Sequence, residues 1–407
     1  MSEKPALRPL DFQPVIHQGQ QMWLLRDPQQ LSESQLMVPT PLAQLLIFCD
    51  GEHTVDEIHA AFSQYVGSEV DYEVVTNALT QLDEACLLEN ERSRKARLHL
   101  LEAYRSQANR PPALADLSYP GDPQRLSKLF RQFGADDDLG QWNGWQGRGI
   151  ISPHIDYQRG GHVYAKVWQR AKSAVLDADL VLILGTDHNG GAGTITLTQQ
   201  PYATPYGVLP TDAGLIEQIA QAIGPENAFA EELHHQREHS VELSAVWLHH
   251  IFQQAGKQPC PMVPVLCGSY HQFLMSGTHP AEDPLINKTI ETLKRETAGK
   301  KVLVVASVDL AHVGPAFSDD FVMDAGRRDQ LVQSDKALVQ AILSGDTDSF
   351  YAQVSAVQNR NRICGLSSID IMLRYLGGAG GVEIAYDHCD ADKKGESLVS
   401  ICGLLLT

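Results

Sequence analysis

Residues 301–312 read KVLVVASVDLAH, a run of apolar residues followed at once by polar side chains. Such a continuous apolar run predicts a β-strand that is buried on both faces. Four other stretches share this pattern: RGIISPHI (148–155), ADLVLILGTDH (178–188), CPMVPVLCG (260–268) and SLVSICGLLL (397–406). Helical stretches lie between them, for example residues 161–176 and 240–256. This alternation predicts an α/β fold in αβα layers, with helices on both faces of a sheet.

The composition is that of a globular protein with room for two domains. The chain has 407 residues, of which 43% are hydrophobic and 20% are charged. The formal net charge is −18, so an electrostatic grip on nucleic acid is not expected. No apolar run approaches the roughly 18 residues that a membrane span needs, and residues 1–15 lack the apolar centre of a signal peptide. We therefore expect a soluble cytoplasmic protein without nucleic-acid or membrane partners.

The seven cysteines are scattered through the chain and form no CxxC pair. An odd number without close pairs argues against a disulfide framework and against a structural zinc knuckle. Any cysteine with a chemical role is therefore expected to act alone.

The first 90 residues predict a small helical domain. Thr40 with Pro41 starts one helix, and Thr54 with Glu57 forms a capping box at the start of the next. Helical spacing continues from residue 71, and residues 86–88 are typical of the first strand of a wing. We predict a winged-helix domain at residues 1–90, a basic helix and Pro-rich linker at 91–117, and the α/β domain at 118–407.

This first domain is strongly acidic. Residues 1–90 hold three basic and fourteen acidic side chains, a net charge of 3 − 14 = −11, which would repel a duplex. The segments DGEHTVDEI (50–58) and ALTQLDEACLL (78–88) resemble the PqqD-like family of winged-helix domains. The resemblance implies a docking domain that recognises a peptide or a partner protein beside a modification enzyme. The alternative is a generic acidic docking or packing domain.

Polar residues follow three of the predicted strands. Ser152-Pro-His154-Ile-Asp156, Gly185-Thr-Asp187-His188-Asn189 and Ser307-Val-Asp309-Leu-Ala-His312 occupy these positions. Groups at the carboxyl ends of strands in an open α/β sheet can converge on one pocket. Glu238-His239 at a helix start and Cys364 at a loop-to-helix junction are further candidates.

Imidazole and carboxylate ligands with an open position suit non-haem Fe(II), and an added thiolate extends the choice to Cu(I) or Zn. His154, His188 and one of Asp309 or His312 form a sensible ligand set, but spacing alone does not decide which side chains bind. Any one of these histidines, taken singly, is typical of a hydrogen-bonded structural residue.

Seven motifs occur in the order found in the Memo family, whose bacterial and archaeal members are called AmmeMemoRadiSam system protein B. They are ISPHIDYQRGG (151–161), LGTDHNG (184–190), YATPYGVLPTD (202–212), REHSVELSAVWL (237–248), MVPVLCG (262–268), VASVDLAHVG (305–314) and ICGLSSIDIML (363–373). The resemblance implies a fold related to class III extradiol dioxygenases.

The same resemblance implies a pocket and its ligands. The pocket residues would be His154, His188, Glu238, His239, Asp309, His312 and Cys364. Iron or copper, as Fe(II) or Cu(I), would be bound by His154, Asp309, His312 and Cys364, which leaves His188, Glu238 and His239 as catalytic candidates.

The chain departs from the family pattern at two acidic residues. Asp156 stands where Gly is usual, and Asp187 stands where Ser is frequent. Each either orients a metal-bound imidazole or lies in a solvated loop. His234 and His235, in a charged stretch, are predicted to lie on a solvated face.

Three functions remain open at this point. The first is a metal-dependent oxidoreductase of the dioxygenase type, in which His188 or His312 acts as acid or base. The second is a non-catalytic adaptor that binds a peptide or a radical SAM protein, because kinship of fold does not transfer chemistry. The third is a metal-free hydrolase with Cys364 as nucleophile.

Overall fold

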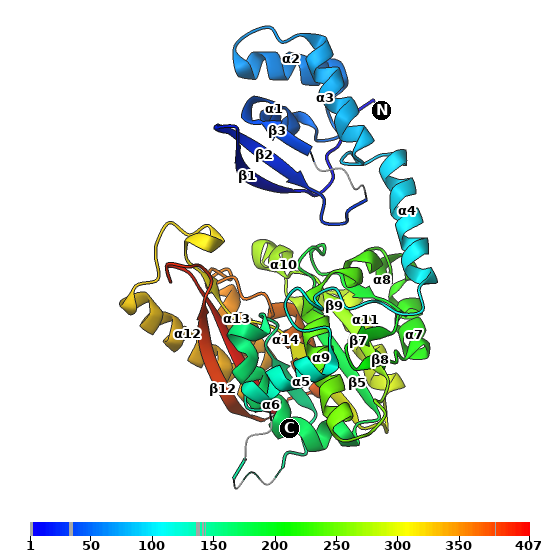
Figure 1. Ribbon diagram of the computed structural model, residues 1–407, viewed down its shortest axis with the longest axis vertical. Helices are drawn as coiled ribbons and strands as arrows, with labels where there is room; N and C mark the ends of the chain where they lie inside the picture. Colours follow the sequence, from blue (N-terminus) through cyan, green and yellow to red (C-terminus); the bar gives the residue numbers. More distant parts are fainter. Residues whose placement is uncertain (1–2, 32–35, 136–138, 141, 143, 379) are drawn as a thin grey trace. The chain divides into compact units, whose positions relative to one another are not determined.

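The computed structural model describes residues 3–31, 36–135, 139–140, 142, 144–378 and 380–407. The chain divides into two compact units, Met1–Gln107 and Ala108–Thr407, which are described separately (Figure 1). No helix in these described ranges is long and apolar enough to cross a lipid bilayer.

The first unit combines a small antiparallel sheet with helices. The sheet has the order β1-β2-β3 and is followed by the helices. The strands are β1 (Asp11–His17), β2 (Gln20–Arg26) and β3 (Leu36–Pro39), and the helices are α1 (Thr40–Leu45), α2 (Val55–Val66), α3 (Tyr72–Glu84) and α4 (Glu91–Ser106). The predicted capping box is present, since the Thr54 and Glu57 side chains each accept a hydrogen bond from the other residue's backbone N–H.

The sheet of this unit lies before the helices in sequence, whereas the prediction placed a strand pair after them. Ala85 and Cys86 form a turn, and Leu88 then makes an isolated bridge with Leu7. The segment that was predicted to be a basic linker helix is α4, and it is part of the first unit.

The second unit is built around an eight-stranded mixed sheet with the order β11-β13-β4-β10-β5-β9-β6, in which β12 also pairs with β13. Its strands are β4 (Gly149–Ser152), β5 (Leu180–Thr186), β6 (Ile195–Leu197), β9 (Met262–Cys267), β10 (Val302–Ser307), β11 (His312–Val313), β12 (Gly381–Asp390) and β13 (Leu398–Leu406). Strands β4, β10, β5 and β9 are parallel to one another. A separate hairpin pairs β7 (Tyr202–Thr204) with β8 (Gly207–Leu209).

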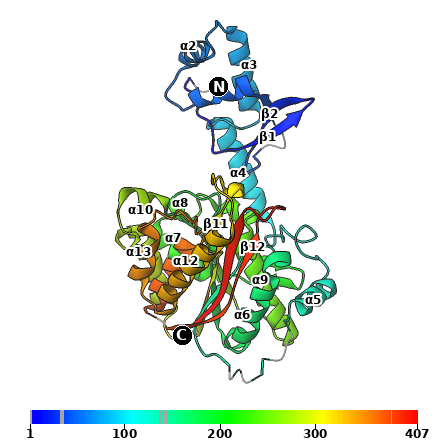
Figure 2. The ribbon, with the colours of Figure 1, turned by 90° about the vertical axis from the view of Figure 1, so that its left-hand side faces the viewer.

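Helices cover both faces of this sheet, as the sequence predicts (Figures 1 and 2). One apolar core packs the sheet against α5 (Pro123–Gln132), α6 (Tyr157–Asp177) and α9 (His239–Gln254). The other packs it against α7 (Ala213–Ile223), α11 (Pro284–Glu296), α12 (Ala325–Leu343), α13 (Thr347–Ser355) and α14 (Leu366–Leu376). The short helices α8 (Pro225–Ala228) and α10 (His271–Ser276) complete the unit. The layered αβα arrangement is confirmed.

Candidate metal centre

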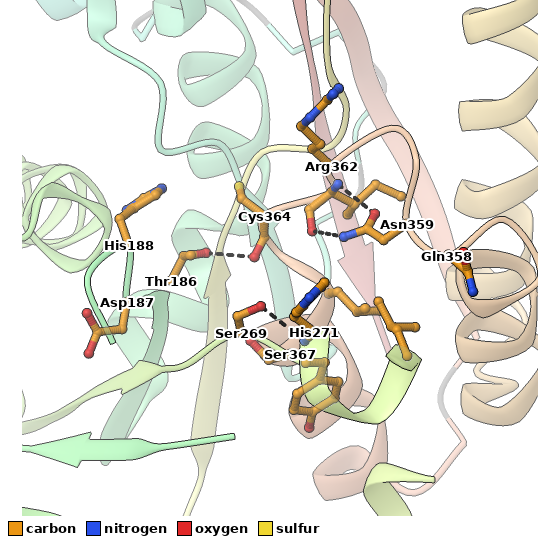
Figure 3. A pocket seen from close by; sticks show the side chains of 14 residues that line it. Thr186, Asp187, His188, Ser269, His271, Gln358, Asn359, Arg362, Cys364 and Ser367 are labelled. Atoms are coloured by element: carbon orange, nitrogen blue, oxygen red, sulfur yellow. Dashed lines mark hydrogen bonds between the residues drawn. The ribbon is translucent and has the colours of Figure 1, made fainter. Parts of the chain in front are cut away.

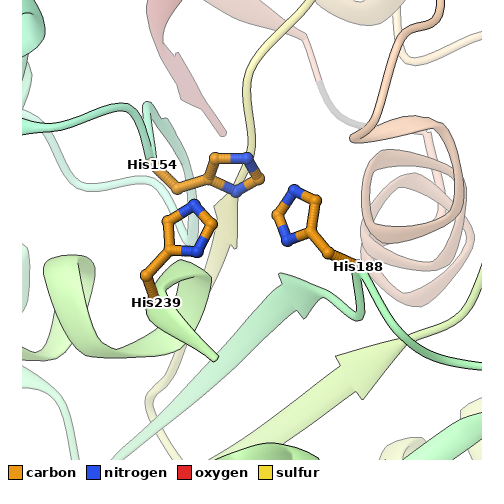
Figure 4. Close-up of side chains that lie close together, drawn as sticks. All are labelled: His154, His188 and His239. Atoms are coloured by element: carbon orange, nitrogen blue, oxygen red, sulfur yellow. The ribbon is translucent and has the colours of Figure 1, made fainter. Parts of the chain in front are cut away.

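The parallel strands β4, β5 and β10 end at the same edge of the sheet. His154 follows β4, His188 follows β5, and Asp309 follows β10. The first residue of α9, His239, reaches the same place (Figure 4). The convergence expected from the strand pattern therefore occurs, and it brings together residues that lie far apart in sequence.

Three imidazoles form the centre of the site. The ligand atoms of His154, His188 and His239 all lie within 4.8 Å of one another. Their ring centroids are 5.0 Å apart for His154 and His188, 5.2 Å for His154 and His239, and 4.8 Å for His188 and His239. Figure 4 shows the three rings turned toward a common point. This spacing suits a single metal ion bound by all three.

Each of these imidazoles has its Nδ1 atom occupied by an acceptor. The Nδ1 of His154 lies 2.9 Å from the carbonyl oxygen of Ser307. The Nδ1 atoms of His188 and His239 lie 3.1 and 3.0 Å from carboxylate oxygens of Glu238. Because carbonyl and carboxylate oxygens only accept, Nδ1 carries the proton in all three rings. The Nε2 lone pair of each neutral ring is therefore left for a metal.

Glu238 organises two of the three ligands. It is the N-cap residue of α9, and its Oε1 accepts hydrogen bonds from the backbone N–H groups of His239 at 2.8 Å and Ser240 at 3.0 Å. Burial raises its pKa, but the hydrogen bonds to His188 and His239 lower it more, so that the pKa lies well below its ordinary value. The carboxylate is thus charged and holds both imidazoles.

Cys364 lies at the edge of the histidine group. Its Sγ is 3.3 Å from Nε2 of His154 and 3.5 Å from the backbone carbonyl of Asp309. Burial raises the pKa of this thiol, whereas His154 and His188 together bring it well below the ordinary value. The thiolate is the form that binds soft metals.

The charges of the site also act on the histidines. Burial lowers the pKa of His154, but Cys364 and Asp309 raise it more, to about 9. Burial lowers the pKa of His188 as well, and its hydrogen bonds to Cys364 and Glu238 carry it well above the ordinary value. Without a cation between them, His154 and His188 take up protons to balance the neighbouring negative charge.

Asp309 and His312 have other contacts. Oδ1 of Asp309 accepts from the backbone N–H groups of His154 at 2.9 Å and Ile155 at 3.2 Å, which shapes the loop after β4. Its Oδ2 lies 3.7 Å from Nε2 of His154. Nδ1 of His312 lies 3.2 Å from the carbonyl of Leu310 and 3.1 Å from that of Arg362. Neither residue belongs to the mutually close group of His154, His188 and His239.

The two unusual acids serve different elements. Asp156 caps α6, accepting from the Arg159 N–H at 3.1 Å and from its Nε at 2.6 Å. Asp187 is buried, and both its oxygens lie 3.0 Å from Nδ1 of His234. Asp187 therefore orients a histidine outside the three-histidine group.

The expectation that His234 and His235 lie on a solvated face is wrong. Both are buried. His235 lies 2.6 Å from the hydroxyl of Tyr202, and burial lowers its pKa to about 3. The many charged neighbours in sequence suggested solvent, but Glu231 and Asp187 instead form ion pairs with His234.

A cavity of about 550 Å³ opens onto the three histidines. Asp156, Arg159, Asp309 and His312 contribute polar atoms to its wall, and Leu243 and Phe317 are among its apolar residues. This volume falls in the range of pockets that bind small molecules. A molecule could thus reach the candidate metal centre.

Comparison with known proteins identifies a similar family. The family described as Memo-like protein matches residues 110–404. A MEMO1 family protein of Aquifex aeolicus is 24% identical over 377 residues, covering 93% of this chain and 92% of that protein. A MEMO1 family protein of Thermococcus kodakarensis is 27% identical over 285 residues, covering 69% of this chain and 91% of that protein. One of Archaeoglobus fulgidus is 25% identical over 274 residues.

Proposed function

The chain belongs to the Memo-like protein family, and from this premise we propose that it binds a redox-active metal ion through His154, His188, His239 and Cys364. The observation that carries the proposal is the convergence of three imidazoles whose Nδ1 atoms are already occupied. A histidine group that served only packing would not need its free nitrogens turned toward one another. Metal-binding histidines usually donate their other ring N–H to a carbonyl or carboxylate oxygen, as these three do.

We propose Fe(II) or Cu(I) as the ion. Imidazole suits both metals, and a thiolate beside the imidazoles favours the softer Cu(I). The Cys364 thiolate is 3.3 Å from His154, close enough to share an ion with it after a small movement. This ligand set differs from the predicted one, which used Asp309 and His312 with His154 and Cys364.

Such an ion would supply one-electron redox chemistry and polarise a bound substrate, which is the basis of a dioxygenase-like activity. The protein's own contribution is to shape the cavity and to manage protons. His312 lines the cavity and has Nδ1 bonded to two carbonyls, so its Nε2 is the free acid or base. Asp309 supports the loop that carries His154.

Metal analysis of anaerobically purified protein tests this proposal. We expect about one iron or copper per chain in the wild type, and a loss of most of it in His188→Ala and in Cys364→Ala. The matched control is His53→Ala, which removes an imidazole from the first unit. Circular dichroism should show that the variants remain folded.

Two results would contradict the proposal. Full metal content in both site variants would remove His188 and Cys364 from the ligand set. Absence of metal from the wild type after loading with either ion under anaerobic conditions would reject the metal centre altogether.

A second function is favoured by a cavity in the first unit. This cavity has a volume of about 470 Å³ and is lined mostly by apolar side chains: Leu7, Phe12, Trp23, Thr40, Ala43, Gln44, Leu46 and Ile47. Phe12 is 43% exposed and Ile47 is 65% exposed. An apolar cavity in an acidic domain suits a partner segment with both apolar and basic residues. We propose that this unit has a PqqD-like docking role for a peptide or a radical SAM protein.

The docking proposal is tested by measuring the affinity of the full chain for a purified radical SAM protein and for a synthetic peptide that carries apolar and basic residues. We expect Trp23→Ala to weaken binding at least tenfold and to leave metal content unchanged. Equal affinity of wild type and variant would exclude this cavity as the docking surface.

A further inference from the structure

The segment that leads to Cys364 is a loop with an unusual backbone. It connects α13 to α14 and contains three residues other than glycine with a φ near +50°, which are Gln358 at 48°, Asn359 at 49° and Arg362 at 50°. This left-handed conformation is unfavourable for residues that have a Cβ, and Asn tolerates it best. A loop persists in such a conformation only when its surroundings hold it there. We call residues 358–364 the thiol loop, because they end at Cys364.

One set of contacts lies within the thiol loop itself. The side-chain amide of Asn359 donates to the carbonyl of Ile363 at 3.2 Å, and the Ile363 N–H donates to the Asn359 side chain at 2.8 Å. Figure 3 shows Asn359, Arg362 and Cys364 in the wall of a cavity of about 320 Å³, which His188 also lines. These internal bonds fix the turn, but they do not by themselves attach it to the rest of the site.

Arg362 attaches the thiol loop to the segment that follows β11. Its Nη2 and Nη1 donate to the two carboxylate oxygens of Asp319, at 2.7 and 3.0 Å. Such a bidentate pair fixes the guanidinium in both distance and direction. The same carboxylate also accepts from the Gly314 N–H at 2.8 Å. Burial raises the pKa of Asp319, but the bonds from Arg362 and Gly314 lower it more, to below its ordinary value, so the carboxylate is charged.

The same arginine bonds to His312 in two ways. Its carbonyl oxygen lies 3.1 Å from Nδ1 of His312, and its Nη1 donates to the His312 carbonyl at 3.3 Å. The Leu310 carbonyl is a second acceptor for Nδ1, at 3.2 Å. Because carbonyl oxygens only accept, Nδ1 carries the proton and Nε2 keeps its lone pair. The tautomer of His312 therefore depends on where the Arg362 carbonyl points.

We propose that Arg362 is a positioning residue, whose ion pair with Asp319 holds the thiol loop against His312. In this arrangement His312 keeps Nε2 free as acid or base, and Cys364 stays 3.3 Å from His154. The proposal rests on the proposed function, in which His312 is the acid or base and Cys364 is a ligand. Arg362 acts through these two residues.

The tautomer of His312 tests the proposal without a metal and without a substrate. Nitrogen-15 NMR of histidine-labelled, EDTA-treated protein at pH 8.5 distinguishes Nδ1–H rings from Nε2–H rings, and the spectrum of His312→Gln identifies the His312 signals. At this pH an imidazole with the ordinary pKa of about 6.5 is neutral. We expect the Nδ1–H tautomer in the wild type, and a mixture of both tautomers in Arg362→Gln and in Asp319→Asn. The double variant should resemble each single variant, because the two residues act as one pair.

Arg362→Gly separates positioning from stability. Glycine adopts a φ of 50° without strain, but it removes the guanidinium. We therefore expect Arg362→Gly to unfold at a higher temperature than Arg362→Gln, and yet to lose the single His312 tautomer to the same extent. The matched control is Arg327→Gln, which breaks an ion pair with Asp324 at the start of α12 and should leave the His312 tautomer unchanged.

Binding of Cu(I), measured by competition with a chelator, is a separate readout. We expect Arg362→Gln to bind Cu(I) about tenfold more weakly than the wild type, because Cys364 is no longer held beside His154. If the wild type binds no ion, the proposed function fails, whereas the result on the His312 tautomer stands.

The proposal is overturned if the wild type holds His312 as the Nε2–H tautomer, or if Arg362→Gln keeps the Nδ1–H tautomer alone. It is also overturned if Arg327→Gln changes the tautomer as much as Arg362→Gln does. If Arg362→Gly retains the wild-type tautomer, the backbone and not the ion pair positions the ring, and the proposal is again rejected. Should Arg362→Gln fail to fold, Asp319→Asn decides by the same measurement.

Discussion

Glu238 accepts hydrogen bonds from the side chains of both His188 and His239, so one carboxylate sets the orientation of two candidate ligands. In Glu238→Gln one oxygen becomes an NH₂ group, which cannot accept from an imidazole. We expect a ten- to hundredfold loss of metal affinity, a size typical when the partner of a ligand is changed. Competition with a chelator of known affinity measures it.

The matched control for this change is Glu231→Gln. Glu231 bonds to His234, outside the three-histidine group. Equal losses of metal affinity in the two variants would show that Glu238 acts through general electrostatics and not through orientation.

His234 makes stability depend on pH. Burial lowers its pKa, but its bonds to Asp187 and Glu231 raise it to about 9. A raised folded-state pKa means that the protonated ring stabilises the fold. This contribution is complete below the unfolded value of about 6.5 and is lost as the pH rises through about 9.

We therefore expect His234→Gln to lower the free energy of unfolding by about 1–3 kcal/mol at pH 6, and by much less at pH 10. Urea denaturation of both proteins at the two pH values measures the difference. If wild type and His234→Gln differ in free energy of unfolding by the same amount at both pH values, His234 contributes through packing and not through its charge.

The sequence indicated most of the individual site residues but not their partnerships. Polar residues after buried strands pointed to His154 and His188, and the helix start pointed to Glu238 and His239. What spacing could not reveal is that His239 comes closer to the other two imidazoles than His312 does. That outcome depends on the direction of each side chain, which the hydrogen bonds of Glu238 and of the Arg362 carbonyl determine.

At the scale of elements, the start of α14 must pass very close to the end of β10. A Cβ added to Gly365 would lie 2.4 Å from Cβ of Val308, the residue before Asp309. We expect Gly365→Ala to destabilise the protein by about 1–3 kcal/mol and to lower metal affinity, because Cys364 and Asp309 are displaced together. Denaturant unfolding and chelator competition measure the two effects.

Gly326→Ala is the control for that substitution. Gly326 lies in the first turn of α12, where the nearest atom to an added Cβ is 3.5 Å away. We expect unchanged metal affinity and a small gain in stability, about 0.5 kcal/mol. If Gly365→Ala changes stability and metal affinity no more than Gly326→Ala does, the close contact of Gly365 with Val308 does not constrain the site.

The elements of the second unit were predictable because their patterns are strong. Strand β5 is buried along its whole length, and its apolar run shows this in the sequence. Strand β1 was missed because nearly all of its residues are exposed, so no apolar alternation marks it. The short strands β6 to β8 have three residues each, too few for a period to be recognised.

At the scale of the whole molecule, a buried network places Arg110 with the α/β unit. Its guanidinium is fully buried, forms an ion pair with Glu242 of α9, and donates to the carbonyl of Glu238 at 3.0 Å. The backbone N–H groups of Ala113 and Leu114 also bond to Glu242, at 2.8 and 2.9 Å. The segment before residue 118 thus provides hydrogen-bond and ion-pair partners of Glu242 in α9, the helix that carries His239.

We expect a fragment of residues 108–407 to fold, and a fragment of residues 118–407 to be less stable by about 3–5 kcal/mol. The shorter fragment leaves the Glu242 carboxylate buried without its cation, and this is the usual cost of breaking a buried ion pair. Urea unfolding followed by tryptophan fluorescence compares the two. Equal unfolding midpoints would show that residues 108–117 add no stability to the α/β unit and that the unit can begin at residue 118.

The relatives differ in how much of the chain they match. The protein of Aquifex aeolicus covers 93% of it, whereas that of Thermococcus kodakarensis covers 69% although 91% of its own length is matched. The match to the Memo-like family, at residues 110–404, lies in the α/β unit. The proposed metal function accordingly belongs to the α/β unit. The proposed docking role belongs to the first unit and is a separate property.

Strand β13 lies inside the sheet, between β4 and β11, although it follows every other strand in sequence. The contact between His154 and Cys364 spans 210 residues. While the ribosome is still translating, β4 has an unpaired edge and the thiol has not met its imidazole. The eight-stranded sheet can therefore close only after residues 398–406 have left the ribosome.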